Sequence, residues 1–218
     1  MENSSRSALV AGRVSVETIM QELSRDRPVF HSEADFQHAF ARSLWELDPL
    51  VQSRLEVRQG NGREYLDLLC NSPVGRTAIE FKYFSRRWSG THGDPAEEYN
   101  LKEHAATDLL RRDFVFDLAR VERFTTHPDT TGLVILLTND PSIWSTPRTN
   151  RSTRDSDFRL HEGRTLKGEL LWGGGDYPAN TRDLVGKYYL GWNDYSTLPG
   201  TNGQFRYLVV AVYLPKRA

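Results

Sequence analysis

The sequence predicts a single α/β domain in which helices flank a central mixed sheet. Apolar side chains recur at helical spacing over residues 33–47 and again over residues 101–125. Between these segments, residues 51–58 alternate apolar and polar side chains, as a half-buried strand does. The apolar run GLVILLT at 132–138 is typical of a central strand covered on both faces. The expected order is therefore helix, three strands, helix, strand.

Two helices are expected before the strands. Residues 14–25 have the spacing of a short helix that ends before Pro28. Ser32 is expected to cap the helix at 33–47, because a serine followed three residues later by an acid, Asp35, is the pattern of a capping box. The apolar stripe of this helix is expected to face the core and consists of Phe36, Phe40, Leu44 and Leu47.

Three strands are expected to follow as a meander. The strand at 51–58 is joined by the turn QGNGR at 59–63 to a second strand at 64–70, so the two form a hairpin. A second turn at 71–76 leads to the strand at 77–84, whose sequence is TAIEFKYF. The third strand should therefore pair with the second.

Two segments of the chain are interpreted as loops. Residues 85–100 are rich in Gly, Ser, Pro and charge, which is typical of an exposed loop. Residues 145–164 are rich in Ser, Thr and Arg without periodicity, and we expect a long mobile loop there.

The C-terminal part is expected to extend the sheet. Residues 183–196 and 205–214 are rich in aromatic and β-branched side chains, as strands are. Residues 1–218 would then form one domain, with a core at about 32–138 and with 139–218 contributing a loop and additional strands.

Composition limits the classes of function. The formal net charge is -1, so a polyanionic partner would have to be bound by a local patch. Cys70 is the single cysteine, which excludes an internal disulfide and a cysteine-based zinc site. The N-terminus lacks the pattern of a signal peptide, and no apolar run approaches the roughly 20 residues that span a bilayer. The sequence predicts a cytoplasmic protein without a membrane partner.

Glu80 and Lys82 interrupt the strand at 77–84 on one face only, because side chains alternate across a strand. The opposite face is mainly apolar and is expected to face the core. Antiparallel pairing with the preceding strand can place Asp67 beside Glu80. Two adjacent carboxylates repel each other unless a cation lies between them. We therefore expect Asp67 and Glu80 to bind Mg²⁺, with Mn²⁺ as a possible substitute.

Lys82 would lie next to a water molecule at such an ion. Its ammonium group could orient the water, accept a proton from it if the pKa of Lys82 were lowered, or offset negative charge in a phosphoryl transition state. These three roles stay open at the level of the sequence.

The arrangement of Asp67, Glu80 and Lys82 on neighbouring strands resembles the PD-(D/E)XK nuclease superfamily, the restriction-endonuclease-like fold, whose core has αβββαβ order. The resemblance implies that Asp67 and Glu80 bind magnesium and that Lys82 assists water attack on a phosphodiester. Glu33 matches an additional acid that many members carry early in the first core helix. Leu66 stands where the name of the family has proline, and the resemblance ends near residue 140.

The resemblance implies a metal-dependent nuclease, of endonuclease type, with DNA as the expected substrate. Arginine suits the phosphate backbone because its guanidinium group forms bidentate contacts. The candidate contacts for nucleic acid follow the third strand or lie in the long loop, and they are Arg86, Arg87, Arg151 and Arg154. The oligomeric state is open, and a homodimer is compatible with the sequence.

Alternative interpretations stay open. A catalytically inactive protein of the same fold could bind nucleic acid or a protein partner. Glu80 and Lys82 could also be a charged face that protects a strand edge in an unrelated sheet. Glu33 could simply complement the dipole of its helix as a first-turn acid.

Overall fold

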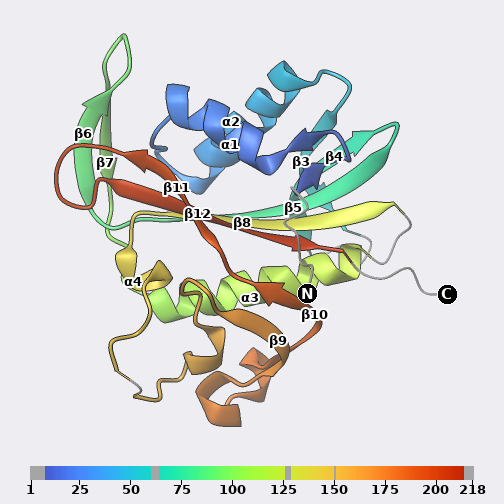
Figure 1. Cartoon of the computed structure of the whole chain (residues 1–218), viewed down its shortest axis with the longest axis vertical. Helices are drawn as coiled ribbons and strands as arrows, with labels where there is room; N and C mark the ends of the chain where they lie inside the picture. Colours follow the sequence, from blue (N-terminus) through green and yellow to red (C-terminus); the bar gives the residue numbers. More distant parts are fainter. Residues whose placement is uncertain (1–7, 60–63, 126–128, 150, 214–218) are drawn as a thin grey trace.

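The computed structural model describes residues 8–59, 64–125, 129–149 and 151–213. Apart from its first residue, the predicted turn at 59–63 lies outside these ranges. The structure is a mixed α/β fold, as predicted, with a central six-stranded sheet and helices on both of its faces (Figure 1). None of the helices in these ranges is long and apolar enough to span a membrane.

The six strands of the central sheet are β3 (Gln52–Arg58), β4 (Tyr65–Ser72), β5 (Gly75–Phe84), β8 (Thr130–Thr138), β11 (Trp192–Thr197) and β12 (Gln204–Val212). Their order across the sheet is β11, β12, β8, β5, β4, β3. β5 and β8 are parallel, whereas the other neighbouring pairs are antiparallel. The predicted meander is confirmed as β3, β4 and β5. β8 is central, as its apolar sequence predicted.

The helices are α1 (Val16–Asp26), α2 (Glu33–Leu47), α3 (Thr107–Phe124) and the short α4 (Pro141–Trp144). α1 and α2 lie on one face of the sheet, and α3 lies on the other (Figure 1). The helices predicted at 14–25, 33–47 and 101–125 are confirmed, although α3 begins at Thr107 because the preceding strand continues to Leu101. A small sheet of β1 (Leu9–Val10) and β2 (Val14–Ser15) precedes α1.

Each face of β5 packs against an apolar core. On one face, the ring of Phe81 lies 5.2 Å from that of Phe36 on α2. On the other face, Phe84 packs in a second core with Phe114 of α3. Glu80 shares the α3 face, because residues two apart on a strand point the same way. The prediction that the apolar face of this strand points to the core is therefore correct. The face that carries Glu80 is covered too, by α3.

The cap of α2 fixes the position of Glu33, the first residue of that helix. The Ser32 hydroxyl accepts a hydrogen bond from the Asp35 N–H at 3.2 Å, which confirms the predicted N-cap. The Asp35 carboxylate accepts from the N–H of His31 at 2.9 Å, one residue earlier than in a capping box. It also accepts hydrogen bonds at 2.8 and 2.9 Å from Arg27.

The interpretation of residues 85–100 as a loop is wrong. This segment contains the antiparallel hairpin of β6 (Trp88–His92) and β7 (Glu97–Leu101), which projects beyond the sheet in Figure 1. Trp88, Tyr99 and Leu101 are buried and hold its base against the first core. The Gly, Pro and charged residues that suggested a loop are concentrated in the turn and on the outer face.

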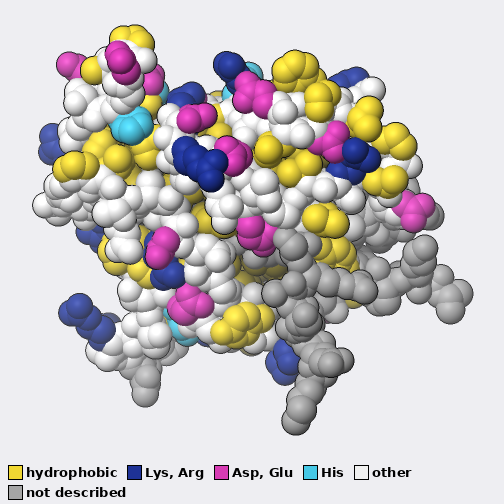
Figure 2. Space-filling view, turned by 45° about the horizontal axis from the view of Figure 1, so that its top comes forward, with side chains coloured by type: hydrophobic (Ala, Val, Ile, Leu, Met, Phe, Trp, Pro, Cys, Tyr) yellow, Lys and Arg dark blue, Asp and Glu magenta, His cyan; other side chains and the backbone are white. Residues whose placement is uncertain are grey.

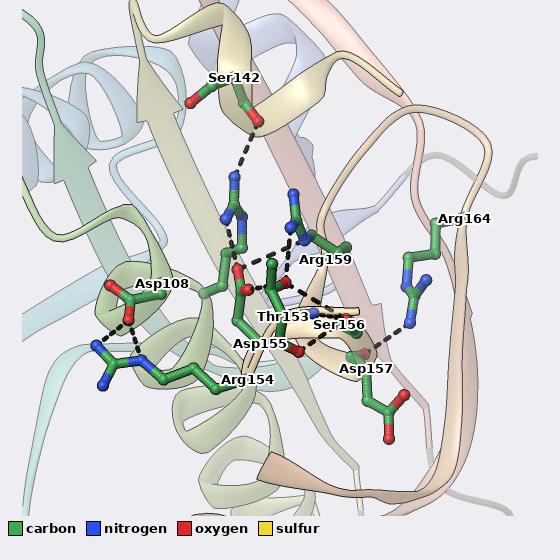
Figure 3. Close-up of polar contacts among 10 residues, drawn as sticks. Asp108, Ser142, Thr153, Arg154, Asp155, Ser156, Asp157, Arg159 and Arg164 are labelled. Carbon is green, nitrogen blue, oxygen red and sulfur yellow. Dashed lines mark hydrogen bonds and ion pairs between the residues drawn. The ribbon is translucent and has the colours of Figure 1, made fainter. Parts of the chain in front are cut away.

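Residues 145–164 are ordered where the structure describes them, which contradicts the prediction of a mobile loop. Asp155 accepts a hydrogen bond at 2.5 Å from Arg111 of α3, and both side chains are buried. Arg154 donates to Asp108 at 2.6 Å, and Phe158 is fully buried. Figure 3 shows how the polar side chains of this segment converge on one another. The Ser, Thr and Arg residues thus hold the segment against α3.

The C-terminal strands extend the sheet only in part. β11 and β12 join the central sheet, as predicted. β10 (Arg182–Tyr189) instead pairs with β9 (Thr165–Leu170) in a separate two-stranded sheet that lies on the α3 side (Figure 1). Three short 3₁₀ helices lie in the connections, at Ser156–Phe158, Trp172–Gly175 and Pro178–Asn180. The buried carboxylate of Glu122 attaches β10 to α3 by accepting hydrogen bonds at 3.1 and 2.8 Å from the N–H groups of Val185 and Gly186.

Candidate functional site

The hydrogen-bonded ladder between β4 and β5 opens near its middle, and carboxylates occupy the opening. The paired residues run from Ser72 and Gly75 to Leu68 and Ile79. Beyond that point, the N–H of Phe81 donates to Asp67 at 2.7 Å. N–H groups two residues apart point to the same edge of a strand, so the N–H of Phe81 points toward β4, as that of Ile79 does. The Asp67 side chain therefore takes the place of a backbone carbonyl of β4 as the partner of the Phe81 N–H.

Glu33 fills the next position along the same edge of β5. Its carboxylate accepts a hydrogen bond at 2.8 Å from the N–H of Tyr83. The contact joins the start of α2 to the strand that carries Glu80 and Lys82. Burial raises the pKa of Glu33 above its ordinary value, and the nearby Lys82 only partly offsets this effect. Glu33 thus contacts β5 directly, in addition to being a first-turn acid of its helix.

Glu80 is fully buried beneath α3 and paired with Arg120. Arg120 Nε lies 2.8 Å from Glu80 Oε1, and Arg120 Nη2 lies 2.6 Å from Glu80 Oε2. Burial raises the pKa of Glu80 to about 9, and the negative charges of Asp67 and Asp117 act in the same direction. Asp67 is therefore close enough to Glu80 to affect its ionisation, as the strand pairing predicted.

Lys82 is paired with an acid that comes from α3. Its Nζ lies 2.6 Å from Asp117 Oδ2 and donates a hydrogen bond to the carbonyl oxygen of Phe81 at 3.1 Å. Burial alone would lower the pKa of Lys82, but Asp117 and Glu33 outweigh it, so the pKa is raised above its ordinary value. Lys82 is a permanent cation at neutral pH. Of the three roles open from the sequence, proton acceptance is therefore the one that this geometry disfavours.

These side chains form a single electrostatic group, which we call the carboxylate cluster. Asp117 connects its two cations, because Asp117 Oδ1 lies 2.7 Å from Arg120 Nη2 while its other oxygen contacts Lys82. Burial also raises the pKa of Asp117. The cluster contains four acids and two bases, with a formal charge of -2 when all are ionised, and its members are Glu33, Asp67, Glu80, Asp117, Lys82 and Arg120.

The donor chemistry of the carboxylate cluster fits a hard divalent cation. In the ranges that the structure describes, no three His, Cys, Asp or Glu side chains are close enough together to hold a metal, so an ion would depend on two carboxylates. Asp67 commits only Oδ2 to a hydrogen bond with the described residues. Glu80 Oε2 is buried and makes an ion pair without a well-oriented hydrogen bond. Magnesium sites use one or two carboxylates together with water and phosphate oxygens.

The structure brings together the four predicted residues Asp67, Glu80, Lys82 and Glu33. Sequence reasoning missed Asp117 and Arg120. A signal for Asp117 was present in the sequence, since it lies next to the apolar stripe of α3, and the structure shows that it is buried. An acid at a core-facing position of a helix is costly unless it is paired.

The arginines predicted to contact nucleic acid have different environments. Arg86 forms an ion pair with Asp140, with Nε 3.0 Å from the carboxylate, and Arg154 is paired with Asp108 (Figure 3). Arg87 and Arg151 are exposed. Two of the four arginines therefore already have carboxylate partners within the protein.

A second group of arginines lies beside the carboxylate cluster on the outer side of α3. Arg112, Phe116, Arg120 and Arg123 follow one another at intervals of three or four residues, so they lie along one stripe of the helix. Arg182 of β10 stacks on the ring of Phe116, with its guanidinium carbon 3.3 Å from the ring centroid. Burial and the positive charges of Arg123 and Arg112 lower the pKa of Arg182. Arg112 and Arg123 each also have a carboxylate partner at 2.8 Å, Asp113 and Glu64 respectively.

On the face that Figure 2 draws, basic and acidic side chains are interspersed. A hollow of about 370 Å³ lies between α1 and α2, and another of about 690 Å³ lies at the turn between β4 and β5. Neither hollow is lined by a residue of the carboxylate cluster.

No protein-family model, curated protein or solved structure matches the chain.

The raised pKa of Glu80 predicts a specific dependence of stability on pH. The folded protein binds the Glu80 proton more tightly than the unfolded chain does, because the pKa rises from 4.5 to about 9 on folding. This contribution is fully present below about pH 4.5 and is lost as the pH rises toward 9. We expect the free energy of unfolding of the metal-free protein, measured by urea denaturation, to fall by a few kcal/mol more between pH 5.5 and 8.5 in wild type than in Glu80→Gln. Parallel pH profiles for the two proteins would contradict this assignment.

Proposed function

We propose that the chain is a magnesium-dependent nuclease that hydrolyses phosphodiester bonds of nucleic acid, with DNA as the expected substrate. The observation that carries the proposal is the opening of the β4–β5 ladder, which gathers Asp67 and Glu33 on the edge of the strand that bears Glu80 and Lys82. Backbone carbonyls of β4 could accept hydrogen bonds from the N–H groups of Phe81 and Tyr83 without placing charge in the interior. A purely structural role therefore does not explain why carboxylates accept these hydrogen bonds instead.

The proposal assigns a role to each member of the predicted set. Asp67 and Glu80 would hold the ion. When bound, Mg²⁺ acts as a Lewis acid and lowers the pKa of the attacking water. Lys82, held as a cation by Asp117, would orient the water or stabilise negative charge on the phosphoryl group. Glu33, with its raised pKa, is suited to accept the proton that the water loses.

Support for nucleic acid as the substrate comes from the arginines beside the cluster. Arg112 and Arg182 lie over the ring of Phe116, at 5.5 and 3.3 Å from its centroid, and Phe116 shares a stripe of α3 with Arg120. Guanidinium groups suit the phosphates of a polynucleotide, and an aromatic ring can stack on a base. These supports are in addition to the resemblance to the PD-(D/E)XK nuclease superfamily.

A second candidate function is nucleic-acid binding without catalysis by the same fold. It is favoured by one observation, the placement of Arg120 on both oxygens of Glu80. An arginine in that position can replace the ion as the counter-charge of the cluster.

Cleavage assays distinguish the two functions. The purified chain is incubated with supercoiled plasmid, with single-stranded DNA and with RNA, in Mg²⁺, in Mn²⁺ and in EDTA. We expect DNA to be cut in Mg²⁺ or Mn²⁺ and to stay intact in EDTA. Binding of nucleic acid without cleavage would favour the second function. Absence of both binding and cleavage would contradict both candidate functions.

A further inference from the structure

Arg120 occupies the oxygens that the proposed ion requires. Its guanidinium group contacts Oε1 and Oε2 of Glu80 at 2.8 and 2.6 Å. A magnesium ligand must approach the ion to about 2.0–2.1 Å. A guanidinium group and a divalent ion on the same carboxylate would compete for its lone pairs and would repel each other.

Arg120 can leave Glu80 without losing every partner. Its Nη2 also lies 2.7 Å from Oδ1 of Asp117, three residues earlier on the same helix. About 23% of the Arg120 side chain is exposed, whereas Glu80 is fully buried. Movement of the arginine toward solvent is therefore physically simpler than movement of the acid.

The charge of the cluster indicates why the exchange is favourable. With Lys82 and Arg120 in place, the cluster keeps a formal charge of -2 when all of its acids are ionised. These two cations are thus an incomplete counter-charge. A divalent cation between Asp67 and Glu80 would neutralise the excess.

We infer that Arg120 is an exchangeable counter-ion of Glu80, which neutralises this carboxylate in the metal-free chain and releases at least one of its oxygens when a divalent cation binds. The inference rests on the proposed function, because it assumes that Asp67 and Glu80 hold the cation. It adds a positioning residue from α3 that neither the sequence nor the resemblance indicated.

The inference is tested by measuring Mn²⁺ affinity by isothermal titration calorimetry at pH 7.5, without nucleic acid. We compare wild type with Arg120→Gln, Arg120→Lys and Arg123→Gln. Arg123 is the matched control, because it lies on the same stripe but pairs with Glu64 at 2.8 Å, outside the cluster. Arg120→Gln is expected to bind Mn²⁺ at least about tenfold more tightly than wild type, because a competing cation is removed. The affinity of Arg123→Gln should be unchanged.

Arg120→Lys provides the test if Arg120→Gln fails to fold, which circular dichroism would reveal. Lysine keeps the charge but cannot contact both Glu80 oxygens as a planar guanidinium does, so the affinity of Arg120→Lys should also exceed that of wild type. Equal or weaker binding by the folded Arg120 variants would overturn the inference and leave the proposed function standing. Absence of Mn²⁺ binding in all four proteins would overturn both.

Discussion

Asp67→Asn is expected to reduce the rate of DNA cleavage by about a thousandfold, because it removes one of the two charged ligands of the proposed ion. Asparagine retains an oxygen that can accept the 2.7 Å hydrogen bond from the Phe81 N–H, so the opening of the β4–β5 ladder should persist. The variant therefore tests charge at fixed geometry. The measurement is the initial rate of plasmid cleavage in Mg²⁺, with the free energy of unfolding determined in parallel.

Asp113→Asn is the matched control for this prediction. Asp113 lies on α3 and pairs with Arg112 at 2.8 Å, outside the carboxylate cluster. Its replacement should leave the cleavage rate within about twofold of wild type. If Asp67→Asn and Asp113→Asn cleave at the same rate, Asp67 does not bind the ion.

Lys82→Met is expected to lower the cleavage rate by about 10²- to 10³-fold while preserving the binding of Mn²⁺. Methionine matches the length of the lysine stem but carries no charge. Asp117 would keep Arg120 at 2.7 Å as a partner, so the acid would not be left unpaired. The combination of lost catalysis and retained metal binding would distinguish a role in catalysis from a structural role.

The pH dependence sharpens this prediction. The pKa of Lys82 is raised in the folded protein, so Lys82 should stay protonated throughout the range in which the protein is active. Any decrease in the cleavage rate at acidic pH should therefore come from other groups. It should have the same shape in wild type and in Lys82→Met. Lys102→Met, at an exposed position, serves as the control. Cleavage by Lys82→Met at the wild-type rate would exclude a catalytic role for this lysine.

The sequence was informative where the signals are local. The N-cap of α2 depends on Ser32 and its immediate neighbours, and the central position of β8 follows from an apolar run that has no polar face. The convergence of Asp67 and Glu80 follows from strand alternation and a short turn. These patterns need no information about distant parts of the chain.

The sequence was misleading where polar residues find partners far away. Arg111 and Asp155 are separated by 44 positions, and their buried ion pair orders a segment whose composition suggests a mobile loop. Arg120 and Glu80 are separated by 40 positions. Composition cannot distinguish an arginine in solvent from one that is paired within the fold. The β6–β7 hairpin was missed because its strands of five residues each give too little alternation to outweigh the Gly and Pro of the turn.

The central claim is that the carboxylate cluster holds a divalent cation, and Mn²⁺ titration of wild type and Asp67→Asn tests it most directly. Wild type is predicted to bind one ion, more tightly at pH 8 than at pH 6, because ligation requires ionised carboxylates and the pKa of Glu80 is raised to about 9. Asp67→Asn, folded to the same extent, should bind at least about 100-fold more weakly. Absence of Mn²⁺ binding by wild type, or equal binding by the two proteins, would contradict the claim.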